Sequence, residues 1–219
     1  MITGGAIINS DGSGEGDFRF EIQPFFMETV EDMSDFIEDA PAIADDIFGS
    51  EQLREDFTKN PHLELVELSL PVPEILIGEL VFDDLKAVIE QEPQLLEQGV
   101  IDFAKQDGVY FIRVHLDRNN IDPVYAMFHL DQNPLIEMFG PHANEDTSEE
   151  EYLEMMEFVL GEPGPPAIIE SAIELEIRVT GRIIAQLGGI REGNTVIFRL
   201  PLIRALLLDQ PIDYAISFE

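Results

Sequence analysis

The stretch that most resembles a chemical site lies near the start of the chain, in DGSGEGD. Carboxylate or hydroxyl side chains occupy every second position there, at Asp11, Ser13, Glu15 and Asp17. With Gly16 at the turn position, this is the pattern of the first half of a calcium-binding loop. Such a loop ends on a bidentate glutamate, and this chain has Ile22 at that position. Because short matches arise often by chance, we interpret the stretch as a Gly-rich hairpin turn.

Other residue types that carry catalysis or bind metals are scattered or absent. The chain has no cysteine, and its four histidines stand in no H-x-x-x-H or H-E-x-x-H frame that would place two imidazoles on one helix face. No G-x-S-x-G, P-loop or G-x-G-x-x-G motif opens a helix. Carboxylates are too abundant for proximity to identify a catalytic pair. We therefore predict a chain that is not an enzyme and has no catalytic residue, metal site or cofactor.

One histidine stands in a row of polar side chains. His115 alternates with apolar residues in GVYFIRVHL, and Arg113 and Asp117 share its face of the predicted strand. This position favours a histidine that is solvated or paired with a side chain of the neighbouring strand.

The charge of the chain limits its partners. Its 219 residues include 45 acidic and 12 basic ones, which gives a net charge of −33 and a pI of about 4.1. No Lys/Arg cluster is present, so we predict no binding to nucleic acid or to a bare anionic membrane surface. This excess of carboxylates suits a protein that works in salt water or outside the cytoplasm.

Apolar residues that could line a ligand pocket are concentrated between about residues 120 and 170. Methionine and phenylalanine repack around flexible ligands, which makes them suitable for a lipid site. The candidate ligand-binding residues are Met127, Phe128, Met138, Phe139, Met155, Met156 and Phe158. The alternative is that these side chains simply form core, as Met and aromatic residues in helices usually do.

Hydrophobic periodicity predicts the elements that would position these residues. Alternating apolar and polar residues indicate strands near 17–22, 108–116, 172–180, 195–200 and 212–218, and two more in HLELVELSL and EILIGELVF. Helical spacing is found in FFMETVEDMSDFI, EQLREDF, DDLKAVIEQEPQLLEQ and SEEEYLEMMEFVL. We predict an α+β fold: an antiparallel β-sheet built from hairpins and covered on one face by helices. Residues 1–219 would form a single domain with a mainly helical insertion at about 120–170.

The last third of the chain resembles a known family. In LEIRVTGRIIAQLGGIREGNTVIFRLPL, Gly181 follows an alternating strand, Gly188 and Gly189 form a turn, and Gly193-Asn194-Thr195-Val196 leads into a second strand. This order is similar to the C-terminal region of LppM-like bacterial lipoproteins. INSDGSGEGDFRFEI and GELVFDDLKAVI also resemble segments of that family. The resemblance covers about half of the chain and leaves residues 120–170 unmatched.

The resemblance implies an exported protein of the bacterial cell envelope that binds a lipid, another apolar ligand or an envelope protein. The chain has no lipobox and no cysteine to lipidate, so membrane attachment would require a signal segment and lipid anchor that this sequence lacks. No apolar run reaches the roughly 20 residues of a membrane span. The alternative function is a structural subunit of an acidic, halophilic virion or surface assembly.

The net charge generates a first prediction. Raising NaCl from low to near-molar concentration should raise the melting temperature, because mobile ions screen the repulsion among uncompensated carboxylates. Thermal unfolding followed by circular dichroism measures this. A melting temperature that stays constant or falls would mean that the carboxylates are locally paired.

Overall fold

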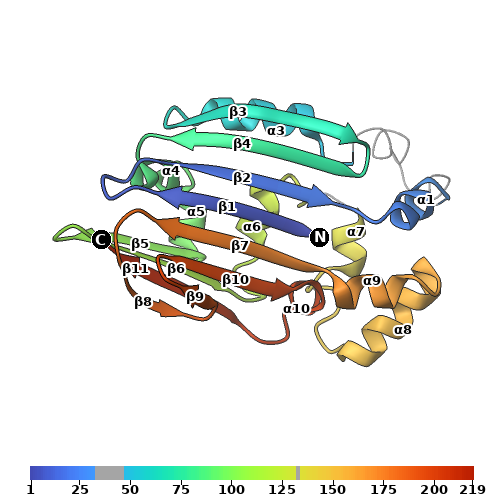
Figure 1. The fold of residues 1–219 in the computed structure, drawn as a ribbon. Helices are drawn as coiled ribbons and strands as arrows, with labels where there is room; N and C mark the ends of the chain where they lie inside the picture. The colour runs from blue at the N-terminus through green and yellow to red at the C-terminus, as the bar shows by residue number, and fades with distance from the viewer. Residues whose placement is uncertain (33–46, 132–133) are drawn as a thin grey trace.

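The computed structural model describes residues 1–32, 47–131 and 134–219. In these residues the protein has an α+β fold, which confirms the predicted class (Figure 1). All seven segments predicted as strands from their alternation lie in β-sheet. The predicted hairpin turn at Asp11 is also confirmed, because its carboxylate accepts hydrogen bonds from the Ser13 backbone N–H and hydroxyl, at 2.9 and 2.7 Å, between two paired strands.

The larger sheet has seven strands in the order β3-β4-β2-β1-β7-β10-β9. Their bounds are β1 (Ile2–Ile8), β2 (Gly14–Glu21), β3 (Leu63–Val72), β4 (Ile75–Phe82), β7 (Ala172–Val179), β9 (Ile190–Glu192) and β10 (Thr195–Pro201). Every pair is antiparallel except β1 and β7, which run parallel with Ile2 opposite Ile173. The sheet is therefore mixed rather than purely antiparallel. Alternation identifies each strand, but it carries no information on the direction in which distant strands pair.

The smaller sheet has four strands in the order β5-β6-β11-β8. Their bounds are β5 (Ile101–Gln106), β6 (Val109–Leu116), β8 (Ile183–Leu187) and β11 (Ile212–Phe218). It lies behind β1, β7 and β10 in Figure 1, and inward side chains of both sheets form one core, among them Val196 of β10 and Phe218 of β11, both fully buried. A second sheet thus covers part of the face that we expected helices to cover.

Helices cover other parts of that face and one end of the larger sheet. Their bounds are α1 (Pro24–Asp32), α3 (Ser50–Lys59), α4 (Leu85–Glu90), α5 (Pro93–Glu97), α6 (Asp122–Met127), α7 (Pro134–Phe139), α8 (Glu149–Leu160), α9 (Gly164–Glu170) and α10 (Leu202–Leu207). Phe57 of α3 stacks on Phe18 of β2 with ring centroids 5.8 Å apart. Phe18 in turn lies over Gly78, where an added Cβ would come within 2.2 Å of its ring.

The region between β6 and β7 contains helices α6 to α9 and no strand among its described residues. The predicted helix in SEEEYLEMMEFVL is α8, which begins with a capping box in which Ser148 and Glu151 bond each other's backbone N–H. Pro93 starts a new helix, so the predicted helix at 83–98 is divided into α4 and α5. The predicted helix in FFMETVEDMSDFI begins as α1, whereas Met33 and Ile37 lie outside the described residues.

None of the helices in the described ranges is long and apolar enough to cross a membrane.

Burial at Phe218 and exposure at Phe158 generate a second prediction. Phe218 is fully buried and stacks on Tyr110, so Phe218→Ala should lower the free energy of unfolding by about 3–5 kcal/mol. Phe158 is 93% exposed, so Phe158→Ala should change the free energy of unfolding by no more than about 0.5 kcal/mol. Urea denaturation of both variants measures the difference. Equal effects would contradict the placement of the core between the sheets.

Candidate functional site

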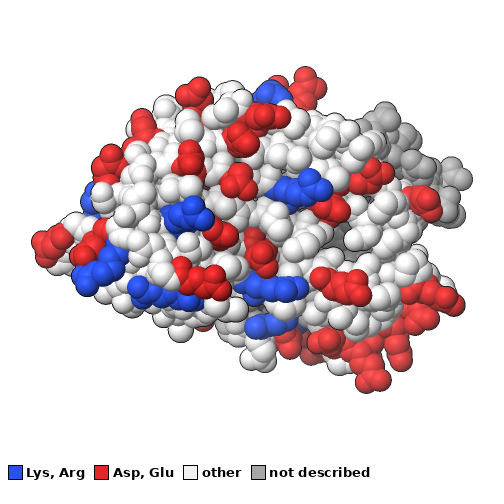
Figure 2. Space-filling view, in the orientation of Figure 1, with Lys and Arg blue, Asp and Glu red and all other residues white. Residues whose placement is uncertain are grey.

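An apolar cavity of about 360 Å³ lies at one end of the larger sheet. Its walls come from the start of β1, the end of β2, the start of β7 and helices α1, α7, α8, α9 and α10. Figure 2 shows the surface hollowed beside the end of the sheet where Figure 1 marks the N-terminus. The cavity is therefore a space between the sheet edge and the helical layer that packs against it.

Helix α8 forms one wall because its apolar stripe faces the sheet end. Tyr152 and Met156 of this helix are 1% and 3% exposed, and both line the cavity. The Tyr152 hydroxyl donates a hydrogen bond to the Phe139 carbonyl at 2.9 Å, which ties α8 to α7. Burial raises the pKa of the Tyr152 phenol far above its ordinary value, so this hydroxyl stays protonated.

Helices α9 and α10 are fixed to the sheet by close backbone contacts. The Leu202 N–H donates to the Ser171 carbonyl at 2.9 Å, which joins the start of α10 to the residue before β7. Gly164 permits α9 to approach α8, because a Cβ there would lie 2.7 Å from the Cβ of Leu160. Ala167 of α9 and Leu206 of α10 complete this side of the cavity.

The lining offers apolar surface and few free polar groups. Thr29 bonds its hydroxyl to the Phe25 carbonyl at 2.9 Å. Glu21 has the one charged side chain of the lining in the described part of the chain, and Arg19 donates to its carboxylate at 2.8 Å. The Met1 ammonium donates to the Glu21 backbone carbonyl at 2.5 Å. A site of this kind can take up an apolar molecule by the hydrophobic effect. It has no nucleophile activated by a base among the described lining residues.

The structure separates the residues predicted from sequence to bind a ligand. Phe139 and Met156 line the cavity, and Met155 packs against the buried cluster that contains Met156. Met127 is half-buried in α6 and does not line the cavity. Phe128, Met138 and Phe158 are exposed by 44%, 50% and 93%. The prediction of ligand binding by the set as a whole stays a prediction.

Sequence reasoning missed the lining residues outside the region 120–170. Ile2 of β1, Phe25 of α1 and Leu206 of α10 lie far apart in the sequence and meet at the end of the sheet. The paired phenylalanines after β2 were a usable signal, because they follow directly on an alternating strand that ends at Glu21. The LIRALL segment after β10 had no predicted element, whereas it forms α10.

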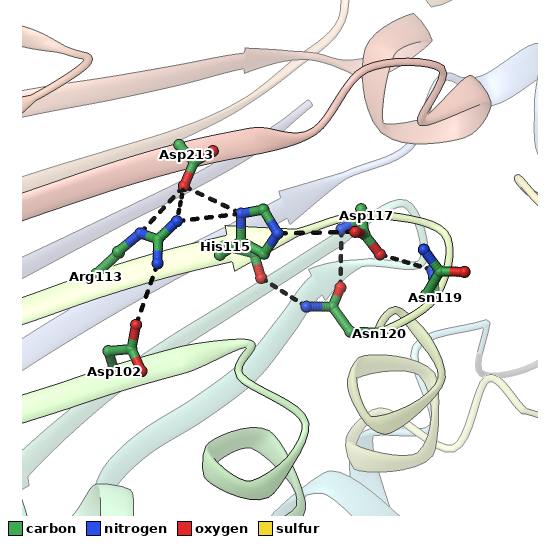
Figure 3. A network of polar contacts seen from close by, with 7 residues as sticks. All are labelled: Asp102, Arg113, His115, Asp117, Asn119, Asn120 and Asp213. Atoms are coloured by element: carbon green, nitrogen blue, oxygen red, sulfur yellow. Dashed lines mark hydrogen bonds and ion pairs between the residues drawn. The ribbon is translucent and has the colours of Figure 1, made fainter.

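A network of polar residues, separate from the cavity, lies on the outer face of the smaller sheet (Figure 3). Arg113 of β6 donates to Asp213 of β11 at 2.6 Å and contacts Asp102 of β5 at 3.3 Å. His115 lies directly opposite Asp213 in the strand register, with Nδ1 at 3.0 Å from its carboxylate. The cross-strand pairing expected for His115 is confirmed. Nε2 of the same ring lies 3.7 Å from Asp117.

A buried asparagine extends this network to the turn after β6. Asn120 is 7% exposed, and its amide donates to the His115 carbonyl at 3.0 Å and accepts from the Asp117 N–H at 2.8 Å. The hydrogen bond from Arg113 is the largest cause that lowers the pKa of Asp213, and bonds and charge from His115 add to it. The charges therefore compensate each other across three strands.

The other three histidines also pair with aspartates, each at a separate place. The ring–carboxylate distances are 2.9 Å for His62–Asp83, 2.6 Å for His129–Asp56 and 2.7 Å for His142–Asp122. No three His, Asp or Glu side chains gather in a way that could hold a metal ion within the described ranges. These pairs connect elements of the fold, whereas the cavity is the better candidate for ligand binding.

The Arg113–Asp213 contact generates a third prediction. Arg113→Gln should raise the pKa of Asp213 toward the ordinary carboxyl range, because the largest stabilising hydrogen bond to the carboxylate is lost. Since the folded-state pKa is lowered, this contact stabilises the fold above the unfolded pKa, and the stabilisation is lost as pH falls through the folded value. Carboxyl NMR titration measures the shift. Arg19→Gln, on the other sheet, is the control and should leave Asp213 unchanged; a constant pKa in Arg113→Gln would contradict the assignment.

No protein-family model matches the chain, and no curated protein matches it. One solved structure is similar at low level, the NMR structure of the folded domain of Mycobacterium tuberculosis LppM. It is 9% identical with a TM-score of 0.43, and the match covers 100% of this chain and 88% of that one. The likeness is thus a distant resemblance at the level of the fold at most.

Proposed function

We propose that this protein is a non-enzymatic binding protein that holds a lipid or another apolar ligand in the cavity at the end of the larger sheet. The observation that carries the proposal is the cavity itself, because its volume of about 360 Å³ falls within the range of about 300–1,000 Å³ that small-molecule sites occupy. Its lining joins apolar side chains from β1, β7 and five helices.

The energetics of such a site favour an extended apolar molecule. Each buried methylene contributes about 0.8 kcal/mol, so an alkyl chain of about ten methylenes contributes about 8 kcal/mol. Association costs about 4–15 kcal/mol, which a long chain can offset and a very small apolar molecule cannot. The internal bonds of Tyr152 and Thr29 add support, because they leave these hydroxyls satisfied when water leaves the cavity.

A place at the bacterial cell envelope is a separate part of the proposal. It is supported by the likeness of both ends of the chain to LppM-like lipoproteins and by the scarcity of basic residues, which suits an ion-rich exterior. Under this proposal a signal segment directs export, and a lipid anchor attaches the mature protein to a membrane. The cavity would then bind its ligand outside the cytoplasm.

Filling the cavity tests the function and is the fourth prediction. Ala167→Phe places a ring into the cavity from α9, so it should abolish saturable binding of the neutral fluorescent probe N-phenylnaphthylamine. Val159→Phe should act in the same way from α8. Fluorescence titration measures binding, and circular dichroism checks that each variant folds.

Ile169→Phe is the matched control, because Ile169 lies in the same helix as Ala167 but is 55% exposed and does not line the cavity. It should bind the probe as the unmodified protein does. Equal binding by Ala167→Phe, Val159→Phe and the unmodified protein would contradict the proposal, and so would an unmodified protein that binds no probe.

A further inference from the structure

Several of the polar side chains that line the cavity are exposed or half-buried, and none of these carries a positive charge. Glu21 and Gln23 are exposed, and Ser171 is half-buried. These are the groups that the polar end of a ligand would meet when its apolar part fills the interior. A carboxylate only accepts hydrogen bonds, whereas the amide and the hydroxyl can both donate and accept.

No Lys or Arg lines the cavity in the described part of the chain. Arg19, two residues before Glu21, directs Nε and Nη2 at the same Glu21 oxygen, at 3.1 and 2.8 Å, so this guanidinium is already paired. Arg204 of α10 is exposed and does not line the cavity. The Met1 ammonium also lies at the lining, where it donates to the Glu21 backbone carbonyl at 2.5 Å and burial lowers its pKa. An anionic ligand would thus find no unpaired Lys or Arg side chain among the described lining residues.

The elements around the cavity add negative charge. From Ser148 to Ser171, which spans α8 and α9, the chain has seven glutamates and no Lys or Arg. Figure 2 shows acidic side chains on several sides of the hollow and a dense acidic group over α8. With a net charge of −33, the field at the cavity repels an approaching anion and attracts a cation.

We infer that the ligand is an amphiphile whose polar end is uncharged or cationic, such as an alcohol, a glyceride or an amine, and that carboxylate- and phosphate-terminated lipids are disfavoured. This inference rests on the proposed function. A hydroxyl or ammonium group can donate a hydrogen bond to Glu21, whereas an ionised carboxylate or phosphate has no proton to donate and repels it.

Three ligands with the same chain test this inference: decanol, decylammonium and decanoate, each titrated against bound N-phenylnaphthylamine at neutral pH. At low ionic strength, decanol and decylammonium should displace the probe at concentrations roughly fivefold or more below decanoate. Added NaCl should narrow the difference, because at 0.1 M it screens charges that lie more than about 10 Å apart and so weakens the field of the surrounding carboxylates. Because Ala167→Phe should not bind the probe, isothermal titration calorimetry is used for this variant and should detect no saturable binding of any of the three ligands. This control separates cavity binding from attraction of decylammonium to the acidic surface.

Glu21→Gln isolates the polar contact and completes the fifth prediction. It should strengthen decanoate binding and weaken decylammonium binding, and leave decanol within about twofold. Glu28→Gln is the matched control, because Glu28 is exposed on α1 and does not line the cavity. Decanoate that binds as tightly as decanol, with no change in Glu21→Gln, would overturn this inference and leave the binding function intact. A cavity that binds none of the three would overturn both.

Discussion

The fold depends on the apolar contact between its two sheets. Val196 of β10 and Phe218 of β11 are fully buried, and Tyr110 of β6 is 1% exposed and stacks on Phe218. Because side chains alternate along a strand, a slip of one residue in any of these strands would turn its apolar residues toward solvent. The contact therefore fixes the register of both sheets together. It also determines which residues face outward, including the row of Arg113 and His115.

The cavity exists because this sheet-on-sheet layer is shorter than the larger sheet. The smaller sheet covers β1, β7 and β10 only toward one end, and the helices that follow β6 and β10 cover the other (Figure 1). Tyr152 and the Leu202 backbone fix these helices through single hydrogen bonds, at 2.9 Å each, to Phe139 and Ser171. An apolar space thus remains at the junction of sheet and helices.

Sequence could predict what is local. The alternation in β2, β6, β7, β10 and β11 identified these strands, and the capping box at Ser148 marks the start of α8. It could not predict the parallel pairing of β1 with β7 or the division of strands between two sheets, because both depend on contacts between distant segments. The site followed the same rule: Phe139 and Met156 lie in the expected region, whereas Ile2 and Leu206 join them only through the tertiary fold. Exposed Phe158 shows that composition alone cannot distinguish a lining residue from a surface one.

With 45 acidic residues against 12 basic ones, most carboxylates of this chain have no cation to pair with, and some of the cations bind backbone carbonyls instead. Arg118, after β6, donates to the carbonyls of Leu207, Asn144 and Glu145 at 2.9, 3.3 and 2.7 Å, joining the end of α10 to the loop before α8. Arg54 donates to the Leu68 carbonyl at 2.9 Å and so holds α3 on β3. A guanidinium bound to carbonyls satisfies backbone acceptors without neutralising an acidic side chain. Mobile ions must then balance the excess negative charge. The segment from Ser148 to Ser171, which forms α8 and α9 beside the cavity, contains no basic residue, so these helices still repel anions.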